Sequence, residues 1–317
     1  MRALGTTAAL AVALAFVVAC GASAPTPTSS GRVTVVTTTS VLADFVSQVG
    51  GDRVDVHPLV PRGADVHTFD PAPSDAQTLS GARLLVANGL GLDDWLVPLA
   101  QAAGAESVPL LELGEDAAGI GYIEGGEDGE EEAEEEGAHG HAVNPHVWLD
   151  VAYARTYVPL LAAALADVDP DGATTYEANS LAFDARLAEL DGWIDQQFAT
   201  LPADARRVVS FHDAFPYFAR AYGLEIVGVV VPVPGQEPSA GEVAQLVEAI
   251  RAAGVRVILA EAQFSDRLAR TIADETGAMV VSRLYTDSVG DAPSDTFEGA
   301  MRWNVEQIVT ALSTTDR

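Results

Sequence analysis

Runs of apolar residues that suit strands alternate with stretches of helical spacing along most of the chain. From Arg32 onward, the expected strands are 32–40, 54–60 and 83–89, and the expected helices are 41–51 and 73–82. The alternation resumes after residue 205, with expected strands at 206–213, 224–233, 256–263 and 278–287 and expected helices at 239–254, 265–277 and 294–312. Such alternation is typical of mostly parallel sheets covered by helices. The pattern predicts an α/β fold with two lobes.

Residues 171–201 separate the two alternating regions and place apolar side chains at helical spacing, with Gly172 and Gly192 as the weak points. We expect one long helix here. The pattern leaves two placements open, because the helix either links the lobes or packs within one of them. The expected division is an N-terminal α/β lobe at 32–170, the linking helix, and a C-terminal α/β lobe at 202–317.

The first residues have the pattern of an export signal, with a basic Arg2, an apolar run and small residues ending at Cys20. Val17-Val18-Ala19-Cys20 resembles the lipobox of bacterial lipoproteins, in which the signal is cut before an acylated cysteine. Cys20 is the only cysteine, so an exported chain would otherwise carry an unpaired thiol. We expect a signal peptide at 1–19 and a lipid-anchored tether at 20–31 on the outer face of the cytoplasmic membrane. The alternative is an ordinary secretory signal with an incidental cysteine.

Charge adds a preference for cations to this picture. The formal net charge of the 317-residue chain is −29, and all 17 basic residues are arginines. Many acids gather in the low-complexity stretch 124–142, which we expect to be a mobile loop, but the remaining acids still far outnumber the arginines. A surface of this sign repels nucleic acid and attracts cations. The loop, with His139 and His141, either concentrates cations or is a plain solvated segment.

Three histidines and one aspartate carry the candidate chemistry. His67 follows the second expected strand, His146 follows Pro145 in a short loop, and His212 and Asp287 end expected strands. Ligands of doubly wound sheets bind beyond the carboxyl ends of strands. Three imidazoles and one carboxylate suit tetrahedral Zn²⁺, whereas Mg²⁺ and Ca²⁺ want oxygen ligands. The spacing alone is a weak signal, because these residues are far apart in the sequence.

Five segments together resemble the metal-binding solute-binding lipoproteins of zinc and manganese ABC importers. They are PRGADVHTFDPAPSD, NPHVWLD, FHDAFPYFARAYGL, LAEAQFS and LYTDSVG. The resemblance runs from Val33 to Leu312. It implies two α/β lobes joined by a single long, rigid helix, with one metal ion in the cleft between the lobes.

The resemblance also implies a ligand set and a partner. The ligands would be His67, His146, His212 and Asp287, and the partner would be the membrane permease of an ABC importer, served by a monomeric binding protein without enzymatic activity. Zinc members of this family usually have histidine at the third ligand position, and manganese members usually have glutamate. His212 therefore favours Zn²⁺ over the alternative, Mn²⁺.

Other residues near these positions have open roles. Glu261 is expected to orient a histidine, to be an alternative fourth ligand, or to cap the following helix. Asp150 and Asp213 carry the same ambiguity, and His57 is expected to be a surface or structural residue. Three aromatic residues are expected in the core: Trp95, Trp148 and Tyr217.

The sequence thus favours capture of Zn²⁺ and its delivery to an importer, with two rivals. One is a Mn²⁺ or Fe²⁺ carrier of the same family. The other is an exported zinc hydrolase, which needs an open coordination position and a general base such as Glu261. Four protein ligands would leave no such position, and no HExxH pattern occurs. Because imidazoles ligate only when neutral, metal affinity is expected to fall below about pH 6.5.

Overall fold

The computed structural model describes residues 31–125, 143–232 and 235–314. The predicted signal peptide 1–19, Cys20, the tether up to residue 30, and residues 126–142 of the acidic loop with His139 and His141 lie outside these ranges. Arg32–Arg317 form one compact unit, and the description below concerns that unit.

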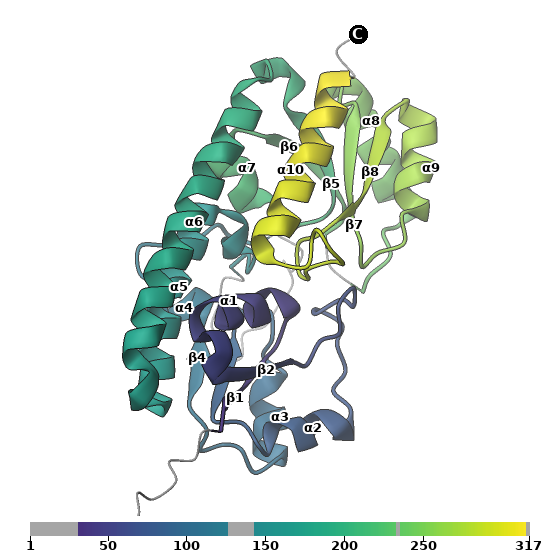
Figure 1. Cartoon of the computed structure of the whole chain (residues 1–317). Helices are drawn as coiled ribbons and strands as arrows, with labels where there is room; N and C mark the ends of the chain where they lie inside the picture. The colour runs from purple at the N-terminus through teal and green to yellow at the C-terminus, as the bar shows by residue number, and fades with distance from the viewer. Residues whose placement is uncertain (1–30, 126–142, 233–234, 315–317) are drawn as a thin grey trace, which may run out of the picture. The chain divides into compact units, whose positions relative to one another are not determined.

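Two parallel four-stranded sheets form the centres of the two lobes (Figure 1). The first sheet has the order β2-β1-β3-β4, and the second has the order β6-β5-β7-β8. The strands of the first are β1 (Val33–Thr37), β2 (Val54–Pro58), β3 (Leu84–Ala87) and β4 (Leu110–Glu112). Those of the second are β5 (Arg207–His212), β6 (Glu225–Val231), β7 (Val257–Glu261) and β8 (Met279–Leu284). The α/β fold with two lobes is confirmed.

Helices cover both sheets because the inner strands are apolar on both faces. Every residue of β3 and of β7 is buried, as is typical of parallel sheets packed between helices. The first lobe has α1 (Ser40–Gly50), α2 (Pro73–Leu79), α3 (Leu96–Ala102), α4 (Leu113–Asp116) and α5 (Val151–Val168). The second has α7 (Pro216–Tyr222), α8 (Ala240–Ala253), α9 (Arg267–Thr276) and α10 (Phe297–Thr314). Short 3₁₀ turns lie at Gly51–Arg53, Val147–Leu149, Pro170–Gly172 and Ala203–Ala205.

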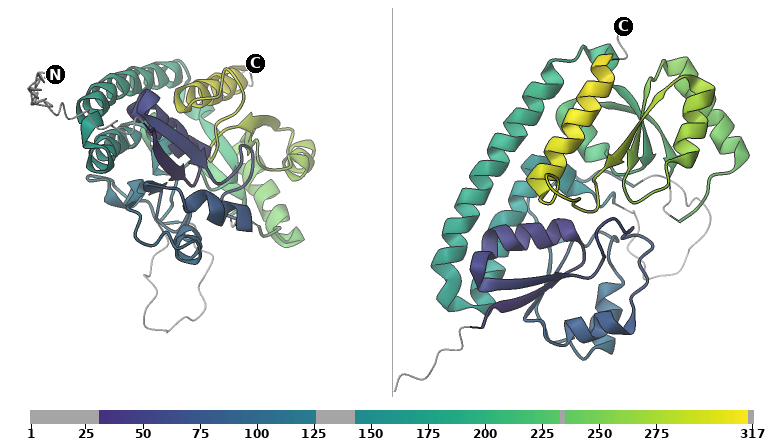
Figure 2. Two further views of the ribbon diagram at one scale, coloured as in Figure 1. Left: turned by 60° about the horizontal axis from the view of Figure 1, so that its bottom comes forward. Right: turned by 45° about the vertical axis from the view of Figure 1, so that its right-hand side comes forward.

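The long helix α6 (Ala173–Ala199) runs unbroken through Gly192 and lies along both lobes (Figure 2). On the first lobe, Asn179 Nδ2 donates to the carbonyl oxygen of Val49 at 3.0 Å. On the second, Asp191 Oδ1 accepts from the hydroxyl of Tyr222 at 2.8 Å. The helix therefore joins the lobes, which the sequence pattern left open.

Aromatic side chains of the two lobes pack against each other and against α6, which runs along both lobes. The ring of Phe45 on α1 lies 5.2 Å from that of Phe183 on α6 and 4.9 Å from that of Phe297 on α10, between centroids. All three side chains are buried. Edge-on aromatic packing of this kind adds to the energy of simple burial. These side chains belong to one apolar core that continues from the first lobe into the second.

The structure differs from the sequence-based expectation in two ways. First, it has five elements that were not predicted: β4, α3, α4, α5 and α7. The helix α5 was not predicted, because Pro159 interrupts its pattern and alanines surround it. Within the described part of the chain, it is the one helix long and apolar enough to cross a membrane by length and composition. It packs against α1 and α6, as a core helix does.

The second difference concerns Asp287, which was predicted to end a strand. That prediction was wrong, since β8 ends at Leu284. The backbone N–H of Tyr285 donates to Asn304 Oδ1 on α10 at 2.8 Å, and Asn304 Nδ2 donates to the carbonyl of Tyr285 at 2.6 Å. A helix side chain thus takes the hydrogen bonds that would extend the strand. Asp287 lies in the loop beyond.

Candidate metal centre

His67 is carried by the loop after β2, and its backbone is held by a neighbouring aspartate. Asp65 Oδ1 accepts from the backbone N–H of His67 at 3.0 Å, and Asp65 Oδ2 accepts from the hydroxyl of Thr68 at 2.8 Å. These two hydrogen bonds hold the chain in a tight turn that belongs to no helix or strand. The side chain of His67 is 18% exposed, and its Nε2 atom is buried without a hydrogen-bond partner.

His146 is oriented by the amide of Asn144. The Asn144 Oδ1 atom accepts from the backbone N–H of His146 at 3.1 Å and lies 3.0 Å from His146 Nδ1. Because an amide oxygen only accepts, Nδ1 carries the proton and the Nε2 lone pair is free. Asn144 Nδ2 donates across to the carbonyl and carboxylate of Asp213, at 2.7 and 3.1 Å. One amide therefore connects the loop of His146 to the residue after His212.

His212 ends β5 and lies beside Glu261, which ends the adjacent strand β7. Glu261 Oε1 is 2.9 Å from His212 Nδ1, and both side chains are buried. The carboxylate accepts from Nδ1, so Nε2 points toward the other rings. Burial alone would lower the pKa of His212, but the charge and hydrogen bond of Glu261, together with Asp287, raise that pKa to about 9.

Asp287 is fixed by its own side chain and by the residue before it. Gln263 Nε2 donates to Asp287 Oδ2 at 2.8 Å, and the Trp148 indole N–H donates to the carbonyl of Thr286 at 2.9 Å. The carboxylate is fully buried, and its Oδ1 atom has no hydrogen-bond partner. Burial would raise the pKa of Asp287, but the surrounding imidazoles, His146 foremost, together hold it below its usual range.

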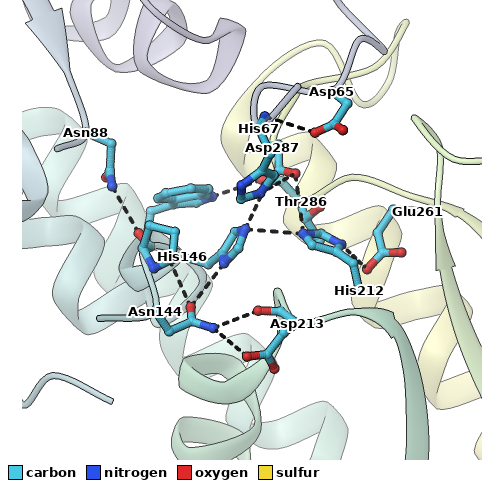
Figure 3. Close-up of polar contacts among 12 residues, drawn as sticks. Asp65, His67, Asn88, Asn144, His146, His212, Asp213, Glu261, Thr286 and Asp287 are labelled. Carbon is cyan, nitrogen blue, oxygen red and sulfur yellow. Dashed lines mark hydrogen bonds and ion pairs between the residues drawn. The ribbon is translucent and has the colours of Figure 1, made fainter. Parts of the chain in front are cut away.

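The four side chains converge from both lobes (Figure 3). His67, His146, His212 and Asp287 each offer one ligand atom, and these atoms lie within 4.8 Å of one another. The Nε2 atom of His146 is 3.3 Å from His212 Nε2 and 3.3 Å from Asp287 Oδ1. Ligand atoms about 2.0–2.1 Å from a tetrahedral Zn²⁺ are separated by about 3.3–3.4 Å. The two shortest separations match that geometry.

The protonation of two of the three histidines, His67 and His146, also suits a cation. Burial lowers the pKa of His67 to about 4, against the opposing charge of Asp287, and burial lowers the pKa of His146 as well. Both imidazoles are therefore neutral near pH 7, which is the ligating form. Buried polar atoms without partners are rare, and two of them, His67 Nε2 and Asp287 Oδ1, face this cluster. A cation at the centre would satisfy both.

The other residues considered in the sequence lie around this cluster or away from it. Glu261 lies behind His212, at the ring edge opposite the cluster, and Asp213 accepts from Asn144. Asp150 caps α5, where its Oδ1 accepts from the backbone N–H of Ala152 at 2.9 Å. The side chain of His57 is 44% exposed and lies beside Asp55, apart from the cluster.

The expected core aromatics have two kinds of surroundings. Trp148 and Tyr217 are buried as predicted, and Trp95 is partly buried against Phe69. Trp148 and Tyr217 also hold the site loops, since the Tyr217 hydroxyl donates to the carbonyl of Asn144 at 3.0 Å. Two supporting residues, Asn144 and Gln263, were not among the predicted site residues. The available signal was that they lie within the segments NPHVWLD and LAEAQFS, two residues before His146 and two after Glu261.

Comparison with known proteins identifies the family of this chain. Residues 35–311 match the family described as zinc-uptake complex component A, periplasmic (ZnuA). The chain belongs to this family. The resemblance inferred from the five motifs is confirmed, and the chain is a metal-binding substrate-binding protein of the ABC importer class.

Members similar to this chain are named for two different metals. The manganese-binding lipoprotein MntA of Halalkalibacterium halodurans is 30% identical over 93% of each chain. The periplasmic zinc-binding protein TroA of Treponema pallidum has a TM-score of 0.76 at 25% identity and covers 89% of this chain and 99% of its own. The protein FpvC of Pseudomonas aeruginosa, solved with Mn²⁺, has a TM-score of 0.77 at 29% identity, covering 90% and 99%. Family membership alone leaves the metal open.

Proposed function

We propose that this protein captures one Zn²⁺ ion with His67, His146, His212 and Asp287 and delivers it to the permease of an ABC importer. The observation that carries the proposal is the convergence of three imidazoles and one carboxylate, with ligand atoms within 4.8 Å of one another. Each of the two buried histidines has its Nδ1 atom engaged, by Asn144 and by Glu261, so that Nε2 is left for the ion.

The donor set supports zinc over manganese. Three nitrogen donors and one carboxylate suit a four-coordinate Zn²⁺, whereas Mn²⁺ favours more ligands and more oxygen. Zn²⁺ also binds more tightly than Mn²⁺ to most nitrogen and oxygen sites. The names of MntA and FpvC favour a Mn²⁺ carrier as the second candidate.

Residues near the amino terminus support the proposed location. The relatives that resemble this chain include proteins named as lipoproteins, and Val17-Val18-Ala19-Cys20 spans the predicted cleavage site between residue 19 and Cys20. We therefore propose a lipid anchor at Cys20, outside the cytoplasmic membrane. A hydrolase is a poor alternative, because Glu261, the candidate general base, is bonded to His212 on the side away from the ligand atoms.

Calorimetric competition on metal-stripped protein tests the choice of metal. We expect Zn²⁺ to bind with a stoichiometry of one and at least about a hundred-fold more tightly than Mn²⁺. Elemental analysis of the protein as purified provides an independent check. Equal or tighter binding of Mn²⁺ would contradict the zinc assignment, and binding of neither ion would contradict metal capture at this site.

The affinity for Zn²⁺ is expected to rise by about ten-fold per pH unit between about pH 6 and 8. The reason is that His212, with its pKa raised to about 9, must release a proton from Nε2 before it can ligate. Binding that releases protons strengthens as pH rises. His67, with its pKa lowered to about 4, adds no slope in this range.

The pH range over which the Zn²⁺ affinity changes thus extends above about 6.5, the pH expected from an ordinary histidine. Zn²⁺ affinities at pH 6, 7 and 8, measured against a chelator of known pH dependence, check it. His57→Ala is the matched control and should keep the slope. An affinity that does not change with pH would argue against ligation by His212.

A further inference from the structure

We propose that Gln263 is a specificity-determining residue of the metal site, one that acts through Asp287 by occupying one of its two carboxylate oxygens. This inference rests on the proposed ligation by Asp287. It assigns a role to a residue that is neither charged nor expected to touch the ion.

Both oxygens of Asp287 face the histidine cluster. Oδ1 lies 3.3 Å from His146 Nε2, while Oδ2 lies 3.6 Å from His212 Nε2 and 3.9 Å from His67 Nε2. A carboxylate placed in this way can give a central ion either one oxygen or both. Two oxygens would make a shell of five ligands, and one would make a shell of four.

Gln263 breaks the symmetry between these oxygens. Its Nε2 atom donates to Oδ2 at 2.8 Å and lies 3.2 Å from the hydroxyl oxygen of Thr286, whereas Oδ1 has no hydrogen-bond partner. The opposite amide orientation would set the Gln263 carbonyl against the carboxylate, so only the donor can face it. The bond withdraws charge from Oδ2 and resists rotation of the carboxylate plane. Oδ1 is thus left as the more basic oxygen.

The Gln263 side chain is kept in place at a cost. Its Oε1 atom is buried without a hydrogen-bond partner, and leaving a buried acceptor unpaired destabilises a fold. A buried polar group of this kind calls for an explanation other than stability. Control of Asp287 provides one, because the bond to Oδ2 requires an amide in this position.

The consequence is a site biased toward four ligands. Zn²⁺ is satisfied by a tetrahedral shell, whereas Mn²⁺ loses stability when it is denied further oxygen ligands. Gln263 would therefore lower the affinity for Mn²⁺ more than that for Zn²⁺. Without its donor, Oδ2 becomes available as a fifth ligand.

The test compares Gln263→Leu with the wild-type chain, both stripped of metal. We expect the ratio of Zn²⁺ to Mn²⁺ affinity to fall by about ten-fold, the effect of one moderately placed hydrogen bond to a ligand. X-ray absorption of the Zn²⁺-loaded proteins should show four nitrogen and oxygen neighbours in the wild type. The variant should show five, at a longer mean distance.

Gln101→Leu is the matched control, because Gln101 is exposed on α3 and apart from the site. Should Gln263→Leu fail to fold, Gln263→Met removes the same donor with an unbranched side chain. An equal loss of both affinities, or an unchanged ratio with four neighbours in the variant, would overturn the role of Gln263 alone. A wild-type chain that binds neither ion would instead refute the proposed function, and the inference with it.

Discussion

Replacing His67 by alanine is expected to weaken Zn²⁺ binding about a thousand-fold and to leave the metal-free fold intact. Four-ligand zinc sites bind with about 10–16 kcal/mol, so an equal share for one ligand is about 2.5–4 kcal/mol, whose upper end corresponds to about a thousand-fold in affinity. His67 Nε2 has no hydrogen-bond partner, and the bond from its backbone N–H to Asp65 survives the substitution. The variant therefore removes one proposed ligand and leaves no other polar group without its hydrogen-bond partner.

The same substitution at His212 would be a poorer test. It would leave Glu261 buried without its partner, and an uncompensated buried carboxylate destabilises a fold strongly. His57→Ala is the matched control for His67→Ala, because His57 lies on β2, the strand before the loop that carries His67, but faces solvent beside Asp55. Chelator competition measures the affinity and circular dichroism the fold. If His67→Ala bound Zn²⁺ as tightly as wild type, His67 would not be a ligand.

Saturation with Zn²⁺ is expected to raise the midpoint of thermal unfolding by about 10 °C. Free ion at a thousand times the dissociation constant stabilises the folded state by about 4 kcal/mol. Each kcal/mol shifts the midpoint by about 2–4 °C in chains of 150–250 residues, and by an amount near the lower end of that range in this longer chain. Part of the gain has a local origin, since the ion would satisfy His67 Nε2 and Asp287 Oδ1, which are both buried without partners.

Differential scanning calorimetry of the stripped and loaded chains measures this shift. Mg²⁺ at the same concentration should give none, because it prefers oxygen ligands. His67→Ala should lose most of the shift at the same Zn²⁺ concentration. If Zn²⁺ did not change the midpoint of thermal unfolding of the wild-type chain, the ion would not bind the folded state preferentially.

Much of the fold could be predicted because its elements have clear local signals. Helix α8 begins after Ser239, whose side chain and that of Glu242 form reciprocal hydrogen bonds with the backbone, and it ends at Gly254 in the left-handed conformation. The three-residue strand β4 lacks such signals, and helix α5, although capped by Asp150, contains Pro159 and has no glycine at its C-terminal end. They form because the lobe packs around them.

Some residues of the candidate site could likewise be predicted from the sequence, and others could not. His212 could be expected at the end of a strand, because the strand-forming run Val208-Val209-Ser210-Phe211 stops there. Asp287 could not be placed, since Asn304 on α10 determines where its loop begins. Asn144 and Gln263 lie within the segments NPHVWLD and LAEAQFS, but the sequence does not say which side chains their amides contact. Their roles depend on contacts over 69 and 24 residues of sequence.

The unequal exposure of the four side chains has a consequence for how long an ion would stay. His146, His212 and Asp287 are at most 2% exposed, whereas the side chain of His67 is 18% exposed and is carried by a loop. The packing of Phe45, Phe183 and Phe297 opposes separation of the lobes. The release of a bound ion that disturbs the least structure therefore begins when His67 detaches from the ion. We expect dissociation to be slow and stepwise, with a residence time set by that loop. A permease that displaced the loop would shorten the residence time without having to separate the lobes.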